Sequence, residues 1–550
     1  MKKLIALLLA VVSVLSLFAG CAGGKKSTGF GSGKDADGVV LTIGLPSNAM
    51  VNDYENNDLT KWLEEQTGYD LQFHVFTGGG EIATQISTMA IGGEKLPDII
   101  YGVNLPEGTV RKYGKDEYFQ DLTPYFEDRE GMSKTFWDRV EATYSEAEIE
   151  DIKRKLYDSD TGKIYYVPTM ETSLVDYIDY QMWINQTWLD KLGLPMPTDV
   201  DSLYETLKAF KTQDPNGNGK QDEVPLFGSE ATTMGGDVIN WIINMYVYFN
   251  DRSGRVFNVD ANGKVYAPFT TDEYREALKF LNKLYDEGLI NSTIFSTNND
   301  AMRNMVSPSS GTALVGIFAG HLTLHFNQGS ALLDQYTSLP LWSNCVINDP
   351  NFSRSMFITQ DCQNVDAAFY LLMTMWSEEA SFRFRYGVEG VNWTYAEEGA
   401  TSAYGLPAKI KILSDPLGTQ NTCMWSGACG GLNVYAEGEA AIYDGATDPW
   451  LAKRAQMAAE SRKNADYACA NFNPSEICPY LVYTTEEAEL IGPNVDACSK
   501  YFKESRTAFI KGEMDPNSDA DWNAYLAKLE DQGLAKWTAA SQNAYNRGVK

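Results

Sequence analysis

The segment from 214 to 223, Asp-Pro-Asn-Gly-Asn-Gly-Lys-Gln-Asp-Glu, has the spacing of a cation-binding loop. Oxygen ligands at alternate positions wrap a hard cation in the way an EF-hand loop binds Ca²⁺. The expected ligands are Asp214, Asn216, Asn218, the carbonyl of Lys220, Asp222 and Glu223, with Gly219 at the sharp turn. The closing carboxylate of an EF-hand would fall on Pro225, so Glu223 has to close this loop early. The alternative is a tandem Asn-Gly turn without metal; any ion here is expected to be structural.

Aromatic residues make up 12% of the chain, and several stand in expected loops or at the ends of expected elements. The faces of Trp and Tyr accept the C–H surface of a pyranose, while amides and carboxylates bind its hydroxyls. The candidate ligand-binding residues are Trp393, Asn392, Glu389, Trp342, Trp425, Trp183 and Tyr180. Each aromatic could instead be a buried core residue, and we expect two or three of the set to line a cleft.

Sequence patterns that would indicate catalysis are weaker than those of the loop at 214–223 and of the aromatic residues. His321 and His325 have the spacing of two ligands on a helix face, but the glutamate of the zinc-peptidase signature is missing. No Gly-x-Ser-x-Gly elbow follows an expected strand. Glycoside hydrolysis needs only two carboxylates, which 74 acidic residues always supply, so a hydrolase stays open on these grounds.

The amino terminus has the pattern of an export signal. Lys2 and Lys3 precede an apolar run, Leu4 to Ala19, that is too short to span a bilayer comfortably. Its end, Leu-Phe-Ala-Gly-Cys21, resembles the bacterial lipobox, with Phe18 where leucine is usual. We expect a signal peptide over 1–20, lipidation (palmitate) of Cys21, and a flexible Gly/Ser-rich tether over 21–38. The alternative is plain secretory cleavage. The expected location is the extracellular face of a bacterial cell membrane.

Charge and cysteine content restrict the partners. Lys and Arg number 45 against 74 Asp and Glu, a formal charge of −29, and no basic patch is evident, so nucleic acid is not an expected partner. The seven cysteines after Cys21 include no Cys-x-x-Cys pair, which argues against a thiol redox motif or a zinc knuckle. Cys423 with Cys429, or Cys469 with Cys478, could form local disulfides; buried thiols are the equal alternative.

The elements that must position these residues alternate between strand and helix. A chain of 550 residues exceeds the size of one hydrophobic core, so two or more compact units are expected. Apolar patterning predicts strands at 39–43, 71–75 and 99–100 and helices at 58–66, 81–90, 198–211, 272–287 and 522–532. Alternation of this kind favours parallel strand pairing in an α/β lobe.

Four segments resemble one known family, the extracellular solute-binding lipoproteins of carbohydrate ABC importers (family 1 type), and in particular the alginate-oligosaccharide and aldouronate binding proteins. They are Leu-Pro-Asp-Ile-Ile at 96–100, Trp-Leu-Asp-Lys-Leu-Gly-Leu-Pro-Met-Pro-Thr at 188–198 with 207–211, Tyr-Gly-Val-Glu-Gly-Val-Asn-Trp at 386–393, and Phe-Ile-Lys-Gly-Glu-Met at 509–514 with 522–529. The resemblance implies a two-lobed α/β fold like that of the periplasmic binding proteins (type II), with hinge strands between the lobes and the ligand cleft between them. The loop at 214–223 is similar to the calcium site of the alginate-binding relatives.

With this resemblance, the sequence predicts a non-enzymatic, monomeric capture protein. It would take an oligosaccharide into the cleft by lobe closure and deliver it to ABC permease transmembrane subunits. The predicted first lobe comprises 39–167 and about 345–388, and the second comprises 168–344 and about 389–550. A net acidic surface slightly favours neutral sugars over uronates. A polysaccharide-degrading surface lipoprotein and a peptide-binding or sensory lipoprotein are the alternatives.

Overall fold

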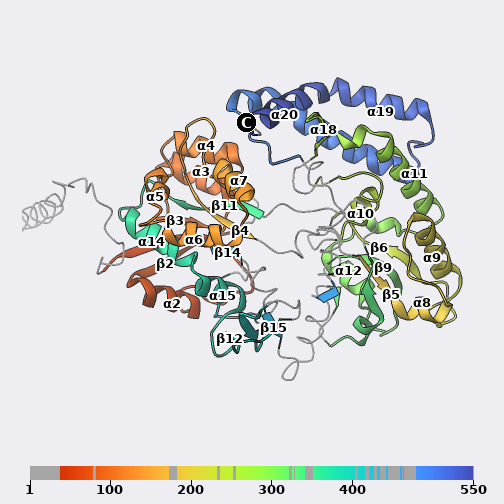
Figure 1. The fold of residues 1–550 in the computed structure, drawn as a ribbon, viewed down its shortest axis with the longest axis horizontal. Helices are drawn as coiled ribbons and strands as arrows, with labels where there is room; N and C mark the ends of the chain where they lie inside the picture. Colours follow the sequence, from red (N-terminus) through yellow and green to blue (C-terminus); the bar gives the residue numbers. More distant parts are fainter. Residues whose placement is uncertain are drawn as a thin grey trace, which may run out of the picture.

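The computed structural model describes residues 38–77, 82–171, 182–231, 236–249, 251, 256–320, 325–326, 329–340, 351–402, 407–414, 416, 420–425, 430–433, 441–443, 459–460, 463 and 478–548. The predicted signal peptide, most of the tether, and three predicted site residues, Cys21, Tyr180 and Trp342, lie outside these ranges. The described chain forms two α/β lobes, which lie on the left and right of Figure 1.

The first lobe is built on a six-stranded mixed sheet with the strand order β14-β4-β11-β3-β1-β2. Its strands are β1 (Val40–Pro46), β2 (Asp70–Phe76), β3 (Ile99–Tyr101), β4 (Val167–Glu171), β11 (Asn351–Ile358) and β14 (Leu432–Asn433). Strand β1 pairs in parallel with both β2 and β3, as the alternating pattern predicts. Strand β11 runs antiparallel between β3 and β4.

Helices cover this sheet, and the end signals in the sequence set their limits. They are α2 (Asp58–Thr67), α3 (Ile82–Gly92), α4 (Glu107–Lys115), α5 (Thr123–Glu127), α6 (Lys134–Thr143), α7 (Glu146–Leu156), α14 (Val365–Met375) and α15 (Glu378–Tyr386). In α2, Leu59, Trp62 and Leu63 are buried on one face, and the helix ends at Gly68, whose φ of 76° suits glycine. The predicted helices at 58–66 and 81–90 are therefore confirmed.

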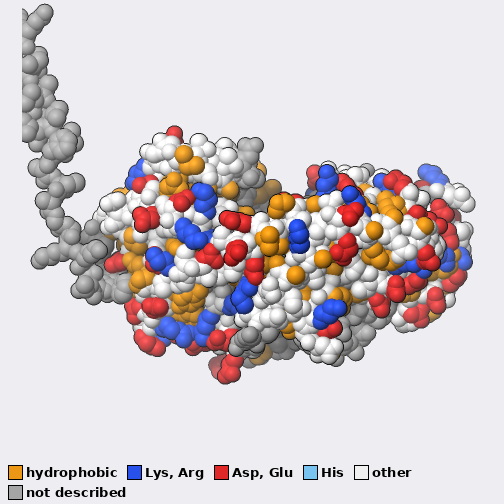
Figure 2. All heavy atoms as spheres, turned by 90° about the horizontal axis from the view of Figure 1, so that it is seen from above, with side chains coloured by type: hydrophobic (Ala, Val, Ile, Leu, Met, Phe, Trp, Pro, Cys, Tyr) orange, Lys and Arg blue, Asp and Glu red, His pale blue; other side chains and the backbone are white. Residues whose placement is uncertain are grey.

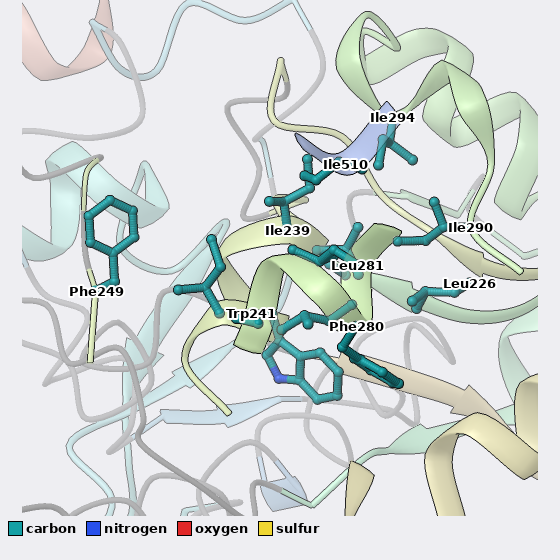
Figure 3. Close-up of a cluster of buried hydrophobic side chains, with 14 of the residues drawn as sticks. Leu226, Ile239, Trp241, Phe249, Phe280, Leu281, Ile290, Ile294 and Ile510 are labelled. Carbon is teal, nitrogen blue, oxygen red and sulfur yellow. The ribbon is translucent and has the colours of Figure 1, made fainter. Parts of the chain in front are cut away.

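The second lobe has a four-stranded sheet with the order β10-β5-β9-β6. The strands are β5 (Met182–Asn185), β6 (Val224–Phe227), β9 (Val315–Ala319) and β10 (Tyr336–Ser338), and a hairpin of β7 (Asn258–Val259) and β8 (Val265–Tyr266) lies apart from the sheet. Its helices are α8 (Gln186–Leu192), α9 (Val200–Thr212), α10 (Val238–Ile243), α11 (Asp272–Asp286), α12 (Asn299–Val306), α18 (Thr485–Lys511), α19 (Asp519–Asp531) and α20 (Leu534–Gly548). Figure 3 shows side chains of α10, α11 and α18 meeting β6 in one apolar core.

Two predicted helices of this lobe show how capping sets a boundary. Thr271 accepts a hydrogen bond from the Tyr274 amide at the start of α11, as predicted. The predicted cap of α9 is one residue early, because Asp199 rather than Thr198 accepts from the Ser202 amide. An acidic side chain caps as well as a hydroxyl, so the sequence alone does not choose between the two neighbours.

The lobes are assembled from separate stretches of chain, and the first lobe includes residues beyond the predicted limit at 388. Trp425 and Leu432 belong to the first lobe's core, and β14 pairs in parallel with β4. The first-lobe sheet also includes β4, beyond the predicted limit at 167. Beside α15, a small sheet of β12 (Trp393–Tyr395), β13 (Ile410–Ile412) and β15 (Ala441–Tyr443) has a core of its own. Residues 478–540 return to the second lobe's core.

Candidate functional site

A pocket of about 390 Å³ lies where the two lobes meet. The first lobe contributes the start of α4, with Glu107, Gly108 and Arg111. The second lobe contributes Val256, Phe257, Cys478, Pro479, Tyr480, Leu481, Tyr483, Ala488 and Trp537. The volume falls in the range of small-molecule sites. Because its walls come from both lobes, the size of this pocket depends on how the lobes are placed relative to each other.

The second-lobe wall of the pocket is largely apolar and aromatic. The rings of Phe257 and Trp537 meet edge to face, with 4.9 Å between their centroids. The ring of Tyr480 lies 5.5 Å from the Lys155 ammonium nitrogen and 5.5 Å from the Arg354 guanidinium carbon, so two cations of the first lobe lie against one ring of the second. Aromatic faces beside charged groups are the combination that an amphipathic ligand requires.

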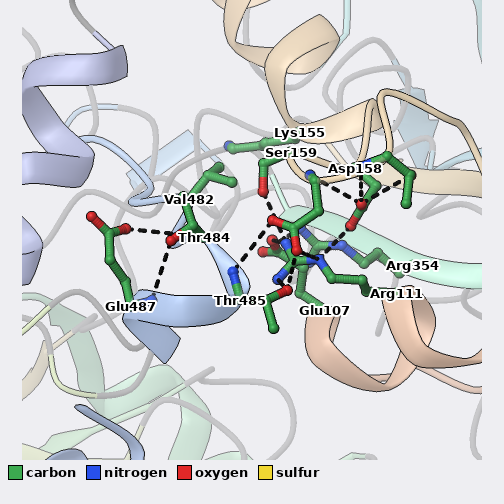
Figure 4. A network of polar contacts seen from close by, with 12 residues as sticks. Glu107, Arg111, Lys155, Asp158, Ser159, Arg354, Val482, Thr484, Thr485 and Glu487 are labelled. Carbon is green, nitrogen blue, oxygen red and sulfur yellow. Dashed lines mark hydrogen bonds and ion pairs between the residues drawn. The ribbon is translucent and has the colours of Figure 1, made fainter. Parts of the chain in front are cut away.

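The first-lobe wall is held by a network of charged groups centred on Arg111 (Figure 4). The Arg111 guanidinium donates to Asp158 over 2.7 Å and to Glu107 over 2.8 Å. The other Glu107 oxygen accepts from Arg354 and from the Tyr480 hydroxyl, each over 3.3 Å. Interactions with these acids raise the pKa of Arg111 although burial opposes the charge. These groups bind one another, so they fix the shape of the wall.

The predicted ligand-binding tryptophans that the structure describes are buried. Trp393 is 0% exposed, donates its indole N–H to the Gly387 carbonyl over 2.9 Å and packs against Phe382. Trp183 is 1% exposed and donates to the Gly320 carbonyl over 2.7 Å. Core packing, the alternative weighed for each aromatic, is what the structure shows for both, and neither lines the interlobe pocket.

Trp425 is also 1% exposed. Its indole N–H donates to the Thr60 hydroxyl over 2.8 Å, and Phe73, Tyr101 and Phe384 meet its ring edge to face at 5.3 to 5.6 Å. Its ring therefore joins β2, β3 and α15 within the first lobe. The glycines that follow Trp425 at 427, 430 and 431 favour a loop position, but the ring itself is packed in the first-lobe core.

The polar companions of Trp393 hold a turn. The Asn392 side chain accepts from the Val388 amide over 2.9 Å and donates to the Ser414 hydroxyl over 3.0 Å. Glu389 lies 3.4 Å from the Arg383 guanidinium. Asn392, Glu389 and Trp393 are thus brought together as predicted, but around the turn that leads into β12 and not around the interlobe pocket.

The predicted cation loop is compact, and its carboxylates accept hydrogen bonds from its own backbone and side-chain amides. The Asp214 carboxylate accepts from the amides of Gly217, Asn218 and Gly219 over 3.0 to 3.1 Å. The side-chain amides of Asn216 and Asn218 donate to Asp222 over 3.1 and 3.0 Å, which lowers the pKa of Asp222. Asp214 has a φ of 47°, in the region that non-glycine residues rarely adopt.

Glu223 gives the clearest indication that the loop suits a cation. One of its carboxylate oxygens is buried without any hydrogen-bond partner, which is costly for a polar atom. Burial raises the pKa of Glu223, and the nearby charges of Asp214 and Asp222 add to the effect. A hard cation would satisfy this oxygen. Among the described residues no group of three or more His, Cys, Asp and Glu side chains gathers to hold a metal, and Asp214, Asp222 and Glu223 are no exception.

A buried ion cluster in the second lobe was not anticipated. Arg506 of α18 is 3% exposed, and its guanidinium donates to Glu230 over 2.8 Å and to Asp251 over 3.1 Å. Burial raises the pKa of neighbouring Asp237 to about 6, although the charge of Arg506 opposes the shift. The acids are dispersed in sequence, and Arg506 stands among other charged residues of an amphipathic helix, so no pattern marks the cluster.

The described surface mixes charges of both signs, and several of the described cysteines carry free thiols. Acidic and basic side chains are interspersed on the face shown in Figure 2. Cys362, Cys423 and Cys498 carry free thiols, and Cys429 and Cys469, which the two possible local disulfides require, lie outside the described residues. Within the described ranges, none of the helices combines the length and apolarity needed to cross a bilayer.

Two α/β lobes with separate cores and a pocket walled by both define a two-lobed binding protein. A model of the family described as bacterial extracellular solute-binding protein matches residues 47–332. The chain belongs to this family, and the predicted fold class is confirmed.

Three proteins illustrate the similarity. Lipoprotein LipO of Bacillus subtilis (strain 168) is 29% identical over 290 residues, which are 53% of this chain and 51% of LipO, so the match spans about half of that relative. The fructooligosaccharide ABC transporter substrate-binding protein FusA of Streptococcus pneumoniae is 25% identical over 406 residues, or 70% of each chain. The crystal structure of an extracellular solute-binding protein from Bifidobacterium longum subsp. infantis superimposes with a TM-score of 0.74 at 23% identity, covering 93% of this chain and 99% of that one.

Proposed function

We propose that this protein is the solute-binding component of an ABC importer, that it captures an oligosaccharide between its lobes, and that it delivers the sugar to the permease transmembrane subunits. The observation that carries the proposal is the interlobe pocket, whose walls come from α4 of one lobe and from α18, α20 and residues 478–483 of the other. The oligosaccharide class is supported by FusA, whose described ligands are fructooligosaccharides. The chain acts as a monomer, held at the extracellular face of the membrane by a lipid on Cys21.

Capture works by a shift between open and closed populations. A ligand that contacts both lobes binds the closed arrangement better, so it shifts the equilibrium toward closure by its differential affinity. The permease then distinguishes the closed form from the open one. No bond in the sugar is broken in this cycle, so the protein is not an enzyme under this proposal.

A neutral oligosaccharide is expected to raise the melting temperature of the protein by a few degrees. A ligand at one hundred times its dissociation constant stabilises the folded state by about 2.7 kcal/mol. We would screen fructooligosaccharides, other neutral plant and host oligosaccharides, and uronate oligosaccharides by thermal shift, with peptides as controls. Neutral oligosaccharides are the expected ligands, because the formal charge of −29 repels acidic sugars at long range.

The results of this screen distinguish oligosaccharide capture from glycan degradation and from peptide binding. A shift with one glycan class, and recovery of that glycan intact by chromatography, is the expected result. Conversion of the glycan to shorter products would establish a degrading lipoprotein instead. A shift with peptides and none with sugars would overturn the oligosaccharide proposal while leaving the family assignment in place.

Calcium is proposed as a structural ion of the loop at 214–223. The unpartnered oxygen of Glu223 and the nearby charges of Asp214 and Asp222 support a hard cation there, and a solved FusA structure is described as an EF-hand mutant. Chelation is expected to lower the melting temperature of the wild-type protein by a few degrees, because an ion that binds only the folded state stabilises it by mass action. Differential scanning calorimetry with and without chelator, together with calcium titration calorimetry, measures the effect.

A matched pair of substitutions separates calcium binding from turn formation. Asp214→Asn keeps the side-chain acceptor of the turn and removes one ligand charge, so the response to chelator should disappear. Asp260→Asn alters a similar exposed turn, in which Asp260 accepts from the Asn262 and Lys264 amides, and should leave the response intact. An equal response in wild type and Asp214→Asn would show that the loop is only a turn.

A further inference from the structure

The polar side chains that line the interlobe pocket bind groups of the protein itself (Figure 4). Both oxygens of Glu107 accept hydrogen bonds, one from Arg111 and the other from the Tyr480 hydroxyl. All three nitrogens of the Arg111 guanidinium donate hydrogen bonds within the protein. The Tyr483 hydroxyl lies 2.8 Å from the Ser541 hydroxyl oxygen. A sugar hydroxyl buried beside these side chains would have to displace an existing hydrogen bond, which is costly.

The charges at the first-lobe wall are also paired. Glu107 and Arg111, the two charged residues among the described lining residues, lie 2.8 Å apart. Arg111 lies a further 2.7 Å from Asp158, and the nearby Lys155 ammonium lies 2.6 Å from Asp151. An ionised ligand would have to break one of these partly buried pairs to find a counter-charge. The pocket therefore favours an uncharged occupant.

The rest of the wall is apolar and has room for a substituted aromatic ring. Val256, Phe257, Leu481 and Trp537 belong to it, and the rings of Phe257 and Trp537 meet edge to face. A dry apolar cavity of about 150 Å³ holds a benzene ring, whereas this pocket has about 390 Å³. A further ring packs well against such aromatic walls, either offset or edge to face. The size suits a ring with a short side arm, such as a hydroxycinnamoyl group.

Small residues and an uncapped helix end lie at the exposed part of the pocket, which we call its mouth. Gly108 of α4 and Ala488 of α18 are the exposed lining residues, one from each lobe. A Cβ added at Gly108 would meet no atom within 4 Å. Helix α4 begins after Pro106 without a side-chain cap, so its first amides remain for an outside acceptor. The oxygen that joins an aromatic ring to a sugar is an acceptor of this kind.

We propose that the interlobe pocket binds an uncharged aromatic substituent carried by the oligosaccharide, while the sugar rings lie beyond the mouth. The substituent is joined to the sugar through an ester or ether oxygen, as in a hydroxycinnamoyl ester. Engaged polar side chains, paired charges and aromatic walls together favour this occupant over a bare sugar ring. The inference rests on the proposed capture of an oligosaccharide, and it names the part of the ligand that this pocket selects.

Ethyl ferulate, an uncharged hydroxycinnamate ester, tests the pocket without any sugar. Titration calorimetry should show that it binds the wild-type protein, and that the ferulate anion binds at least tenfold more weakly. Ala488→Phe adds a ring at the mouth from an exposed helix position and should weaken ethyl ferulate binding at least tenfold. The matched control is Leu490→Phe, on the same helix at a 64% exposed residue outside the pocket lining, which should leave the affinity within about twofold.

A pair of glycosides tests whether the aromatic group belongs to the sugar. The glycan identified by thermal shift is prepared as its 4-nitrophenyl glycoside and as its methyl glycoside, and calorimetry gives both dissociation constants. The aryl glycoside should bind the wild-type protein at least tenfold more tightly than the methyl glycoside. This ratio should fall to about one in Ala488→Phe and stay unchanged in Leu490→Phe.

The outcomes separate failure of this inference from failure of the proposed function. Equal affinity of the wild-type protein for the two glycosides would overturn the inference and leave sugar capture established. An equal loss of both affinities in Ala488→Phe would also overturn it, because the sugar itself would then occupy the pocket. Binding of ethyl ferulate by a protein that binds no sugar would overturn attachment to a sugar together with the proposed function. A melting temperature of Ala488→Phe close to that of Leu490→Phe shows that both variants are folded.

Discussion

Replacing Arg506 by methionine is expected to lower the free energy of unfolding by about 3–5 kcal/mol, because removing one partner leaves buried charges uncompensated. Arg506 lies between Glu230, Asp251 and the side-chain oxygen of Asn240, at 2.8 to 3.1 Å. The Asp251 side chain is 4% exposed. Methionine fills much of the volume, so the loss measures charge and not packing. Urea denaturation followed by tryptophan fluorescence gives the value.

A matched control lies on the same helix. Lys503 is 51% exposed and 3.9 Å from Asp251, so Lys503→Ala should cost well under about 1 kcal/mol, as surface ion pairs do. Equal losses for Arg506→Met and Lys503→Ala would show that the buried cluster does not stabilise the lobe.

The pH dependence of the Arg506→Met penalty provides a second check. Asp237 has a pKa of about 6 in the folded protein against an ordinary value of 3.8. The folded state thus retains a proton that the unfolded state releases, and the free energy of unfolding from this group falls as pH rises from about 4 to 6. In the Arg506→Met variant, protonation of the buried acids reduces the repulsion between them. The loss of unfolding free energy caused by the substitution should therefore be smaller at pH 5 than at pH 7.5.

Replacing Trp425 by alanine is expected to destabilise the first lobe by about 3–5 kcal/mol, the usual cost of removing a buried aromatic side chain. Three aromatic rings and the Thr60 hydroxyl lose their partner in this variant. Sugar affinity, measured below the melting transition, should stay within about threefold of wild type. Calorimetric unfolding and sugar titration on the same sample separate the two properties.

The comparison variant is Tyr395→Ala, which removes a ring that is 49% exposed and should change stability little. Trp425→Phe should recover much of the stability because it retains ring contacts. A stable Trp425→Ala protein with tenfold weaker sugar binding would restore this residue as a stacking platform for the ligand.

Local patterns in the sequence predicted local structure well. The order β1, α2, β2, α3 and β3 follows from apolar periodicity and from glycine stops such as Gly68, because each signal lies within the element that it defines. The compact turn at 214–223 is recognisable for the same reason, since all its polar groups fall within ten residues, while its cation stays a prediction. Parallel pairing of β1 with its neighbours followed from the helices between the strands.

Features that join distant segments were not predictable from one sequence. Strand β14 has two residues, and its partner β4 lies more than 250 positions earlier, so no local pattern marks the pairing. Asp160 and Thr485 each belong to segments that look solvent-facing in isolation, and only the folded lobes bring them together. Trp393 follows a glycine-containing turn and Trp425 precedes a run of glycines, which indicates loops but does not reveal that each ring packs in a core.

The interleaving of the two lobes along the chain bears on how the protein reaches its folded form. The first core needs segments from residue 39 to residue 432, and the second needs segments from 182 to 540. The first core cannot be completed before residue 432 has been synthesised, and the second cannot be completed before residue 540 has been synthesised. Both depend on contacts of high sequence separation, which form slowly. The first core can therefore be completed more than one hundred residues before the second, and the last helices of the chain are needed for the second core alone.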